Sequence, residues 1–139
     1  MAGVHFGFDN FKQLLELNIG ISERLDESRS ESFTLLYCDF STVSKEVIKS
    51  SLESVLRTSD AIVNNESDYF FVLPYTDKYG AEIVKNMFIE FFARDLDSSK
   101  VSYPKDGETP QQLLEELRDM VSVTYKNELR CLDKFIQYR

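Results

Sequence analysis

Arg57 and Asp60 are spaced as R-x-x-D, a pairing that could grip an anion or a nucleotide base. Arginine presents a planar fork of N–H donors that matches a phosphate or the acceptor edge of guanine, and aspartate accepts hydrogen bonds from guanine N–H groups. The same spacing also admits a local role, in which an arginine favoured by the dipole at a helix C-terminus lies beside a loop aspartate. The spacing alone leaves both interpretations open.

Other chemistries are limited by the few histidines and cysteines. His5 is the single histidine, so neither a multi-histidine metal site nor a histidine relay can be built. Cys38 and Cys131 are too few for a disulfide framework in a domain of this size. Cys38 lies in an apolar run and is expected to be a small buried hydrophobe.

The size and composition favour a single soluble domain. The chain has 139 residues, 42% of them hydrophobic and 29% charged. Its net charge of -8 disfavours broad nucleic-acid binding but leaves room for a local anion site. No apolar stretch has the length of a membrane span, and Met1 to Gly7 lacks the pattern of a signal peptide. We therefore expect a cytoplasmic chain without membrane insertion, of a size that suits one piece of a longer protein.

The first half of the chain predicts a helix, a strand and a second helix. Apolar residues three and four apart predict a helix over Phe8–Arg24, and the polar stretch Asp26–Ser32 reads as a loop. The apolar run Phe33–Phe40 (FTLLYCDF) predicts a buried strand. Ser41–Ser44 offers an N-cap for a helix that ends near Arg57.

The second half predicts a hairpin followed by helix, strand and helix. Ala61–Val63 and Tyr69–Leu73 are short strands around a polar turn. The remaining expected elements are a helix at Ala81–Ala93, a strand at Val101–Tyr103, a helix from Pro110 towards Tyr125, and a tail, Glu128–Arg139, that is a strand or a further helical turn. This order predicts an α/β (α+β) sandwich of ferredoxin-like type, with helices packed on one mostly antiparallel sheet.

Several segments, taken in order, resemble the GGDEF domains of the diguanylate cyclase family. The resemblance covers nearly the whole of residues 1–139, which implies a single degenerate GGDEF domain with the palm-type fold of nucleotide cyclases. It is carried by Asp60–Asp77 (DAIVNNESDYFFVLPYTD), by Val101–Leu114 (VSYPKDGETPQQLL), by Asp119 and Lys126 at the spacing of the family's A-D…A-K ending, and by Gly7, Phe8 and Asn10 at the entry to the first helix.

The signature itself can be aligned in two registers. Counting back from Pro74 places it on Asn65–Tyr69, whereas counting forward from Asp60 places it on Glu66–Phe70 (ESDYF). We prefer the second register, which matches Asp68 and Phe70 to the signature Asp and Phe. It also leaves the family's five residues between the R-x-x-D and the signature. It predicts that Tyr69 or Phe70 is buried in a strand.

The resemblance implies a catalytic site that is largely lost. In the family two carboxylates hold Mg²⁺, and two signature glycines admit the nucleotide. Here Glu66 and Ser67 replace the glycines, and Tyr69 replaces the signature Glu. Asp39 and Asp68 remain as candidates to share one cation, or as ordinary acids near strand ends.

The segment after Asp39 is also reduced. Only about five residues separate Asp39 from Lys45, and they lack the F-K-x-I-N-D and G-H-x-x-G-D residues by which the family recognises guanine and ribose. We therefore expect no catalytic residues and no cofactor, with Mg²⁺ involved only if residual activity survives.

Three functional hypotheses follow from the resemblance. The first is a catalytically inactive signalling domain that binds cyclic di-GMP through Arg57 and Asp60, the family's product-inhibition motif, and signals to attached or partner domains. In this hypothesis Lys85 lies near the place of a second family arginine. The second is a protein-interaction or homodimerisation module without a nucleotide. The third is a residual diguanylate cyclase that uses Asp39, Asp68 and Lys126 to make cyclic di-GMP from GTP.

Overall fold

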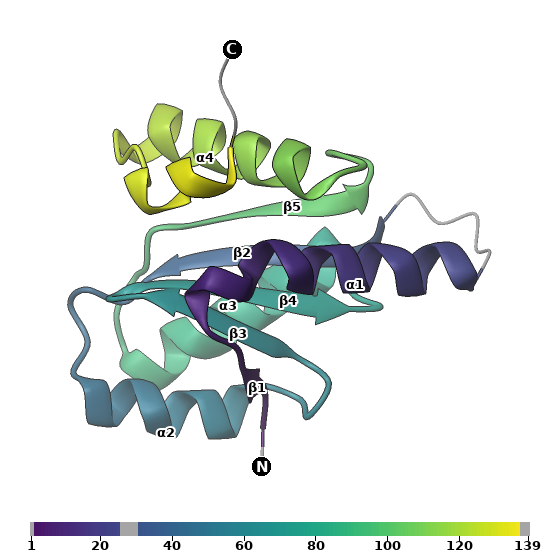
Figure 1. Cartoon of the computed structure of the whole chain (residues 1–139). Coiled ribbons are helices and arrows are strands. Elements are labelled where there is room, and N and C mark those ends of the chain that lie inside the picture. Colours follow the sequence, from purple (N-terminus) through teal and green to yellow (C-terminus); the bar gives the residue numbers. More distant parts are fainter. Residues whose placement is uncertain (1, 26–30, 137–139) are drawn as a thin grey trace.

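A five-stranded sheet forms the centre of the computed structural model, which describes residues 2–25 and 31–136 (Figure 1). The strand order is β1-β3-β4-β2-β5. All neighbouring strands are antiparallel except β1 and β3, which are parallel. The strands are β1 (Val4–His5), β2 (Glu31–Asp39), β3 (Ala61–Asn65), β4 (Asp68–Pro74) and β5 (Ser98–Pro104).

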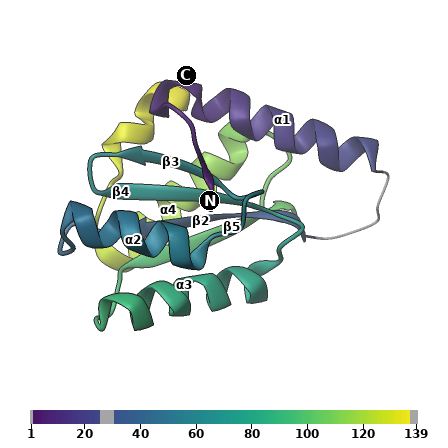
Figure 2. The same ribbon diagram turned by 90° about the horizontal axis from the view of Figure 1, so that it is seen from below.

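Helices cover both faces of this sheet. Helices α2 and α3 lie together on one face, and α1 and α4 pack on the opposite face, as Figures 1 and 2 show from two directions. The order β2-α2-β3-β4-α3-β5, with β4 and β2 in the middle, is the split βαβ arrangement of ferredoxin-like folds. The helical segments are η1 (Phe8–Asn10), α1 (Phe11–Arg24), α2 (Lys45–Val55), α3 (Lys78–Phe92), α4 (Pro110–Tyr125) and η2 (Arg130–Phe135).

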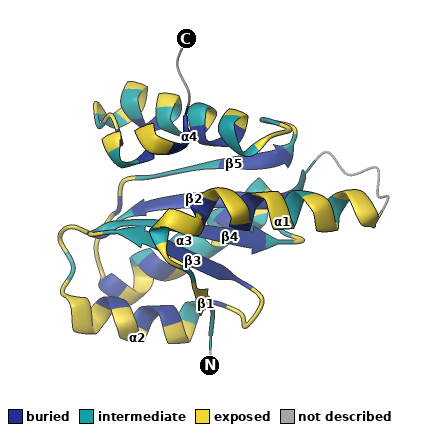
Figure 3. Cartoon of the chain, viewed as in Figure 1, coloured by how far each residue is buried: buried dark blue, intermediate teal, exposed yellow. Residues whose placement is uncertain are grey.

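The two central strands are buried on both faces, which explains their continuous apolar sequences (Figure 3). In β2, Leu35 and Tyr37 belong to the core beneath α1 and α4, whereas Leu36 and Cys38 belong to the core beneath α2 and α3. This alternation follows from the two-residue period of a strand. It fixes which β2 and β4 side chains can meet on each face.

Capping residues explain where three helices begin. Ser44, Asp77 and Thr109 each accept a hydrogen bond from a backbone N–H in the first turn of α2, α3 and α4 respectively. Pro110 occupies the first turn of α4, where its missing N–H costs nothing. Strand β4 ends at Pro74, as the sequence predicted.

The predicted fold class and the predicted order of elements from the first long helix to the last are confirmed. Strand β1 was not predicted, because two exposed residues carry no hydrophobic pattern and are held by backbone bonds such as Val4 N–H to Asp60 O at 2.9 Å. The tail forms the 3-10 segment η2. Of the two predicted alternatives for the tail, a strand or a further helical turn, the structure agrees with the helical turn. Of the predicted loop at 26–32, residues 26–30 lie outside the described residues, as do 137–139 of the tail, and 31–32 begin β2.

Membrane insertion has no structural support in the described residues. Between residues 2–25 and 31–136, no helix combines the length and the apolar character needed to cross a bilayer.

Candidate functional site

The hairpin between β3 and β4 contains residues 66–70, which the preferred register aligns with the GGDEF signature. Its connection consists of Glu66 and Ser67, because Asn65 and Asp68 are the last paired residues. The φ angle of Glu66 is 52°, in the left-handed region that glycine adopts at little cost. The structure therefore places Glu66 and Ser67 at a tight tip, and of the two only Glu66 has the left-handed backbone that favours glycine.

Asp39 and Asp68, the candidate cation ligands, lie opposite each other on adjacent strands. Two-residue alternation puts both on the sheet face that α1 and α4 cover, the face of Tyr37 and Phe70. The Asp39 carboxylate accepts a hydrogen bond from the Ser41 backbone N–H at 2.8 Å. Among the described residues, no three His, Cys, Asp or Glu side chains gather closely enough to bind a metal ion.

Tyr37 connects this carboxylate pair to the core. Its ring is fully buried, and its hydroxyl donates a hydrogen bond to Asp68 Oδ1 at 2.7 Å. The same hydroxyl oxygen accepts a hydrogen bond from Asn127 Nδ2 at 3.4 Å. Sequence reasoning missed Tyr37, although one signal was present: it lies two residues before Asp39 and so shares its face of the strand.

Burial and neighbouring charges raise the pKa of the Asp68 carboxyl. Burial is the largest cause, and the negative charges of Asp39 and Glu66 add to it, whereas the Tyr37 hydrogen bond acts in the opposite direction. The pKa of the Tyr37 hydroxyl is raised far above its usual value, first by burial and then by its bond to Asp68. Tyr37 therefore stays protonated and remains a hydrogen-bond donor.

The residues after Asp68 are packed into strand β4. Phe70 is 0% exposed in the core with Phe11 and Tyr37, so the prediction that Tyr69 or Phe70 is buried is confirmed. Tyr69 is half-buried on the other face, where its ring lies 4.9 Å from that of Phe40. In the preferred register, Tyr69 stands where the family has a catalytic acid and packs against a phenylalanine.

The connection between β2 and α2 has little free chain. It runs from residue 40 to residue 44, a span of five residues. Phe40 is fully buried against Phe88 and Phe92, and Ser44 caps α2. Between them, the Thr42 carbonyl accepts a hydrogen bond from the Arg94 guanidinium at 2.8 Å. This connection is therefore fixed at both ends, by a buried ring and by a helix cap.

Arg57 and Asp60 bind each other at the corner between α2 and β3. The Asp60 side chain is 2% exposed, and its two oxygens accept the Arg57 backbone N–H at 2.8 Å and the Arg57 guanidinium at 3.0 Å. The guanidinium, 56% exposed, also donates to Pro74 O and to Thr76 Oγ1. The pair therefore links the α2–β3 corner to the β4–α3 corner, and the prediction that it binds a ligand stays a prediction.

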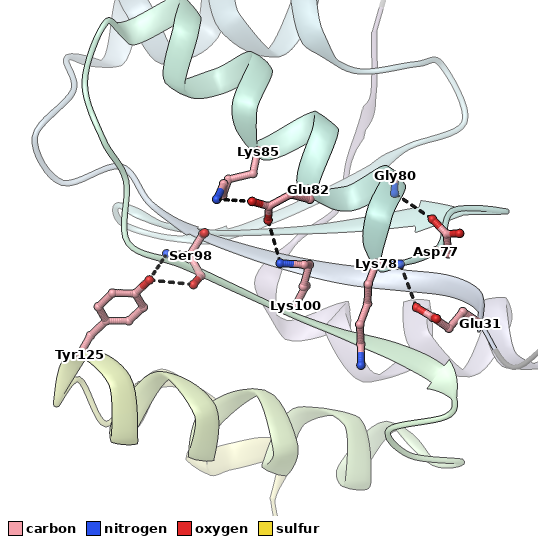
Figure 4. Close-up of polar contacts among 9 residues, drawn as sticks. All are labelled: Glu31, Asp77, Lys78, Gly80, Glu82, Lys85, Ser98, Lys100 and Tyr125. Atoms are coloured by element: carbon pink, nitrogen blue, oxygen red, sulfur yellow. Dashed lines mark hydrogen bonds and ion pairs between the residues drawn. The ribbon is translucent and has the colours of Figure 1, made fainter.

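The remaining residues of the sequence hypotheses are dispersed. Lys85 donates to Glu82 at 2.7 Å, and Lys100 of β5 donates to the same carboxylate at 2.8 Å (Figure 4). Bonds to these two lysines, Lys100 first, lower the pKa of Glu82. Asp119 lies on α4, and Lys126 follows α4 with a φ of 58°. Lys85 is thus committed to an ion-pair cluster on the face opposite to Asp39 and Asp68.

The overall fold resembles that of a solved structure of the GGDEF class. A sensory box/GGDEF family protein from Caulobacter crescentus CB15 superposes with a TM-score of 0.62 over 87% of this chain and 92% of that chain, at 17% sequence identity. No protein-family model matches the sequence, and no curated protein matches it. The likeness therefore establishes a GGDEF-like fold.

Proposed function

We propose that this chain is a catalytically inactive GGDEF-type signalling domain. The observation that carries the proposal is the five-residue connection from Phe40 to Ser44. At one end of this connection the Phe40 ring is buried, and at the other end Ser44 caps α2. A nucleotide cyclase must hold its substrate base as well as its phosphates, because phosphoryl transfer depends on positioning. A domain without a base pocket keeps the scaffold and loses that positioning.

Two further features support inactivity. Glu66 puts a carboxylate at the hairpin tip, where an approaching nucleotide would bring phosphate charge. Asp68 Oδ1 is bonded to the Tyr37 hydroxyl, and Tyr69, which takes the place of the signature Glu, packs its ring against Phe40.

The test is incubation of the purified chain with GTP and Mg²⁺ or Mn²⁺, followed by chromatography of the products. We expect no cyclic dinucleotide from wild type. Asp68→Asn serves as the matched control, since any trace of product that persists in this variant comes from a contaminating enzyme. Product formed by wild type and lost in Asp68→Asn would overturn the proposal.

Binding of cyclic di-GMP at Arg57 is the finer part of this proposal. The exposed guanidinium supports it, because an arginine fork can bind a phosphate while it keeps other partners. Asp60 would have to exchange its present bonds to receive a base. Calorimetry of wild type and Arg57→Ala with cyclic di-GMP decides the matter: an absence of heat from wild type at about 100 μM protein would exclude useful affinity.

Self-association is a second candidate function, favoured by an exposed apolar stripe on α3. Four large side chains recur every fourth residue along this helix, so they share one side of it. They are Tyr79, Ile83, Met87 and Phe91, with exposed fractions of 76%, 45%, 39% and 41%. Exposed apolar side chains that share one side of a helix favour a contact surface.

The stripe fits a second copy of this chain. Its ends are aromatic and its middle is aliphatic, symmetrically about residue 85. An antiparallel two-fold pairing of α3 would place each Tyr79 against the other copy's Phe91, and each Ile83 against the other copy's Met87. The four side chains expose on the order of 400 Å² per copy, below the roughly 800 Å² of a stable interface. The expected dimer is therefore weak.

Sedimentation over a range of concentrations tests this candidate. We expect a dimer that strengthens with salt, because each copy carries a net charge of -8 and salt screens the repulsion. Ile83→Glu should abolish it. Val123→Glu, at a solitary exposed position of α4, is the matched control and should not. A wild type that stays monomeric at about 0.5 mM would contradict self-association.

A further inference from the structure

The Asp39–Asp68 pair presents an electrostatic problem. The two residues are directly opposite on neighbouring antiparallel strands, with side chains on the same face. Carboxylates at this separation repel each other unless a proton, a cation or hydrogen-bond donors lie between or beside them. What occupies their surroundings therefore determines what the pair can bind.

The groups beside Asp68 are donors. The Tyr37 hydroxyl accepts from Asn127 Nδ2 at 3.4 Å, so its own proton points along the 2.7 Å bond to Asp68 Oδ1. The oxygen of the Asn127 side chain is used elsewhere, because it accepts the Leu129 backbone N–H at 3.1 Å. Asn127 is therefore oriented with its amino group towards Tyr37.

A divalent cation needs the opposite arrangement. Mg²⁺ and Mn²⁺ take oxygen ligands with free lone pairs and keep several waters. Here one oxygen of each carboxylate already accepts a hydrogen bond, Asp39 Oδ1 from the Ser41 N–H and Asp68 Oδ1 from the Tyr37 hydroxyl, and the buried Tyr37 ring fills the same sheet face. The described residues supply no third acidic, histidine or cysteine ligand nearby.

We propose that Tyr37, oriented by Asn127, closes the Asp39–Asp68 pair to divalent cations. The partial positive charge of the Tyr37 hydroxyl proton lies against Asp68 Oδ1, at an oxygen that a cation would otherwise bind. The inference rests on the proposed inactive state of the same site and names the residue responsible for one part of it. Removal of the hydroxyl should leave Asp68 without that donor and open the pair to a metal ion.

The experiment is a Mn²⁺ titration followed by the electron paramagnetic resonance of free Mn²⁺. Wild type should show no saturable site up to about 5 mM, and Tyr37→Phe should bind at least about tenfold more tightly. Tyr37→Phe/Asp68→Asn is the matched control and should lose the site. Saturable binding by wild type below 1 mM that Asp68→Asn removes would overturn the inference, as would a folded Tyr37→Phe that binds no better than wild type.

A measurement that does not use Tyr37→Phe covers the case in which this variant fails to fold. A cation that binds the native state raises its melting temperature by mass action. We expect about 5 mM Mg²⁺ to leave the melting temperature of wild type unchanged relative to Asp68→Asn, and a rise confined to wild type would overturn the inference. The readout is metal binding, so its failure is distinct from the appearance of a cyclic dinucleotide, which would refute the proposed function.

Discussion

Replacement of Asp60 by alanine is expected to destabilise the fold substantially, although Asp60 belongs to a motif associated with ligand binding. Its carboxylate is 2% exposed and accepts two hydrogen bonds, both from Arg57. Alanine would leave the Arg57 backbone N–H without its acceptor. It would also release the guanidinium that connects to Pro74 and Thr76.

The magnitude follows from the two bonds taken separately. The bond between the buried carboxylate and the backbone N–H is charge-assisted and contributes about 1.5–3 kcal/mol. The ion pair to the guanidinium is discounted to about 0–1 kcal/mol, because the arginine side chain is 56% exposed to screening water. Asp60→Ala should therefore cost about 3 kcal/mol. Arg57→Gln, which keeps the backbone bond, should cost only about 1 kcal/mol.

Urea unfolding of wild type, Asp60→Ala and Arg57→Gln at pH 7 measures both values. A pair kept for ligand binding would give a different pattern, in which both variants retain wild-type stability and lose ligand heat equally. A cost below about 1 kcal/mol for Asp60→Ala would refute the structural interpretation of this pair.

Three other outcomes are expected. Burial raises the pKa of Asp68 in the folded state; the Tyr37 hydrogen bond opposes this rise, and the charges of Asp39 and Glu66 add to it. Wild type therefore loses stability as pH rises through that pKa. Asp68→Asn should melt at a higher temperature than wild type at pH 7 but not below pH 4. Phe40→Ala should cost about 3–5 kcal/mol in urea unfolding, since its buried ring packs on Phe88 and Phe92. Burial raises the pKa of the Cys131 thiol to about 11, so maleimide labelling should be slow at pH 7 and faster towards pH 10, whereas native Cys38 should stay unlabelled at both pH values.

Much of the fold was predictable because local patterns carried it. The runs FTLLYCDF and YFFVL predicted buried strands, and the polar turn between β3 and β4 predicted a hairpin. The cap at Ser44 and the stop at Pro74 were also visible in the sequence. Strand β1 was not, since backbone bonds to its neighbours hold it and its side chains are exposed.

The candidate site was only partly predictable. The sequence identified Asp39, Asp68, Arg57 and Asp60 as polar residues at meaningful spacings. It gave no indication that Asp60 is buried, because burial is set by tertiary packing at the α2–β3 corner, where the Arg57 guanidinium also contacts Pro74 and Thr76. It also did not reveal that Tyr37 meets Asp68, a residue 31 positions away.

Composition, hydrophobic period and turn chemistry act over a few residues, so the sequence by itself determined the element order, the fold class and the shortened connection after Asp39. Strand register and helix docking act between residues far apart in the chain, so only the tertiary structure placed Asp39 opposite Asp68, with the Tyr37 hydroxyl beside them. The surroundings of a carboxylate decide whether it accepts a proton, a donor or a cation. The chemistry of this site was therefore decided by packing.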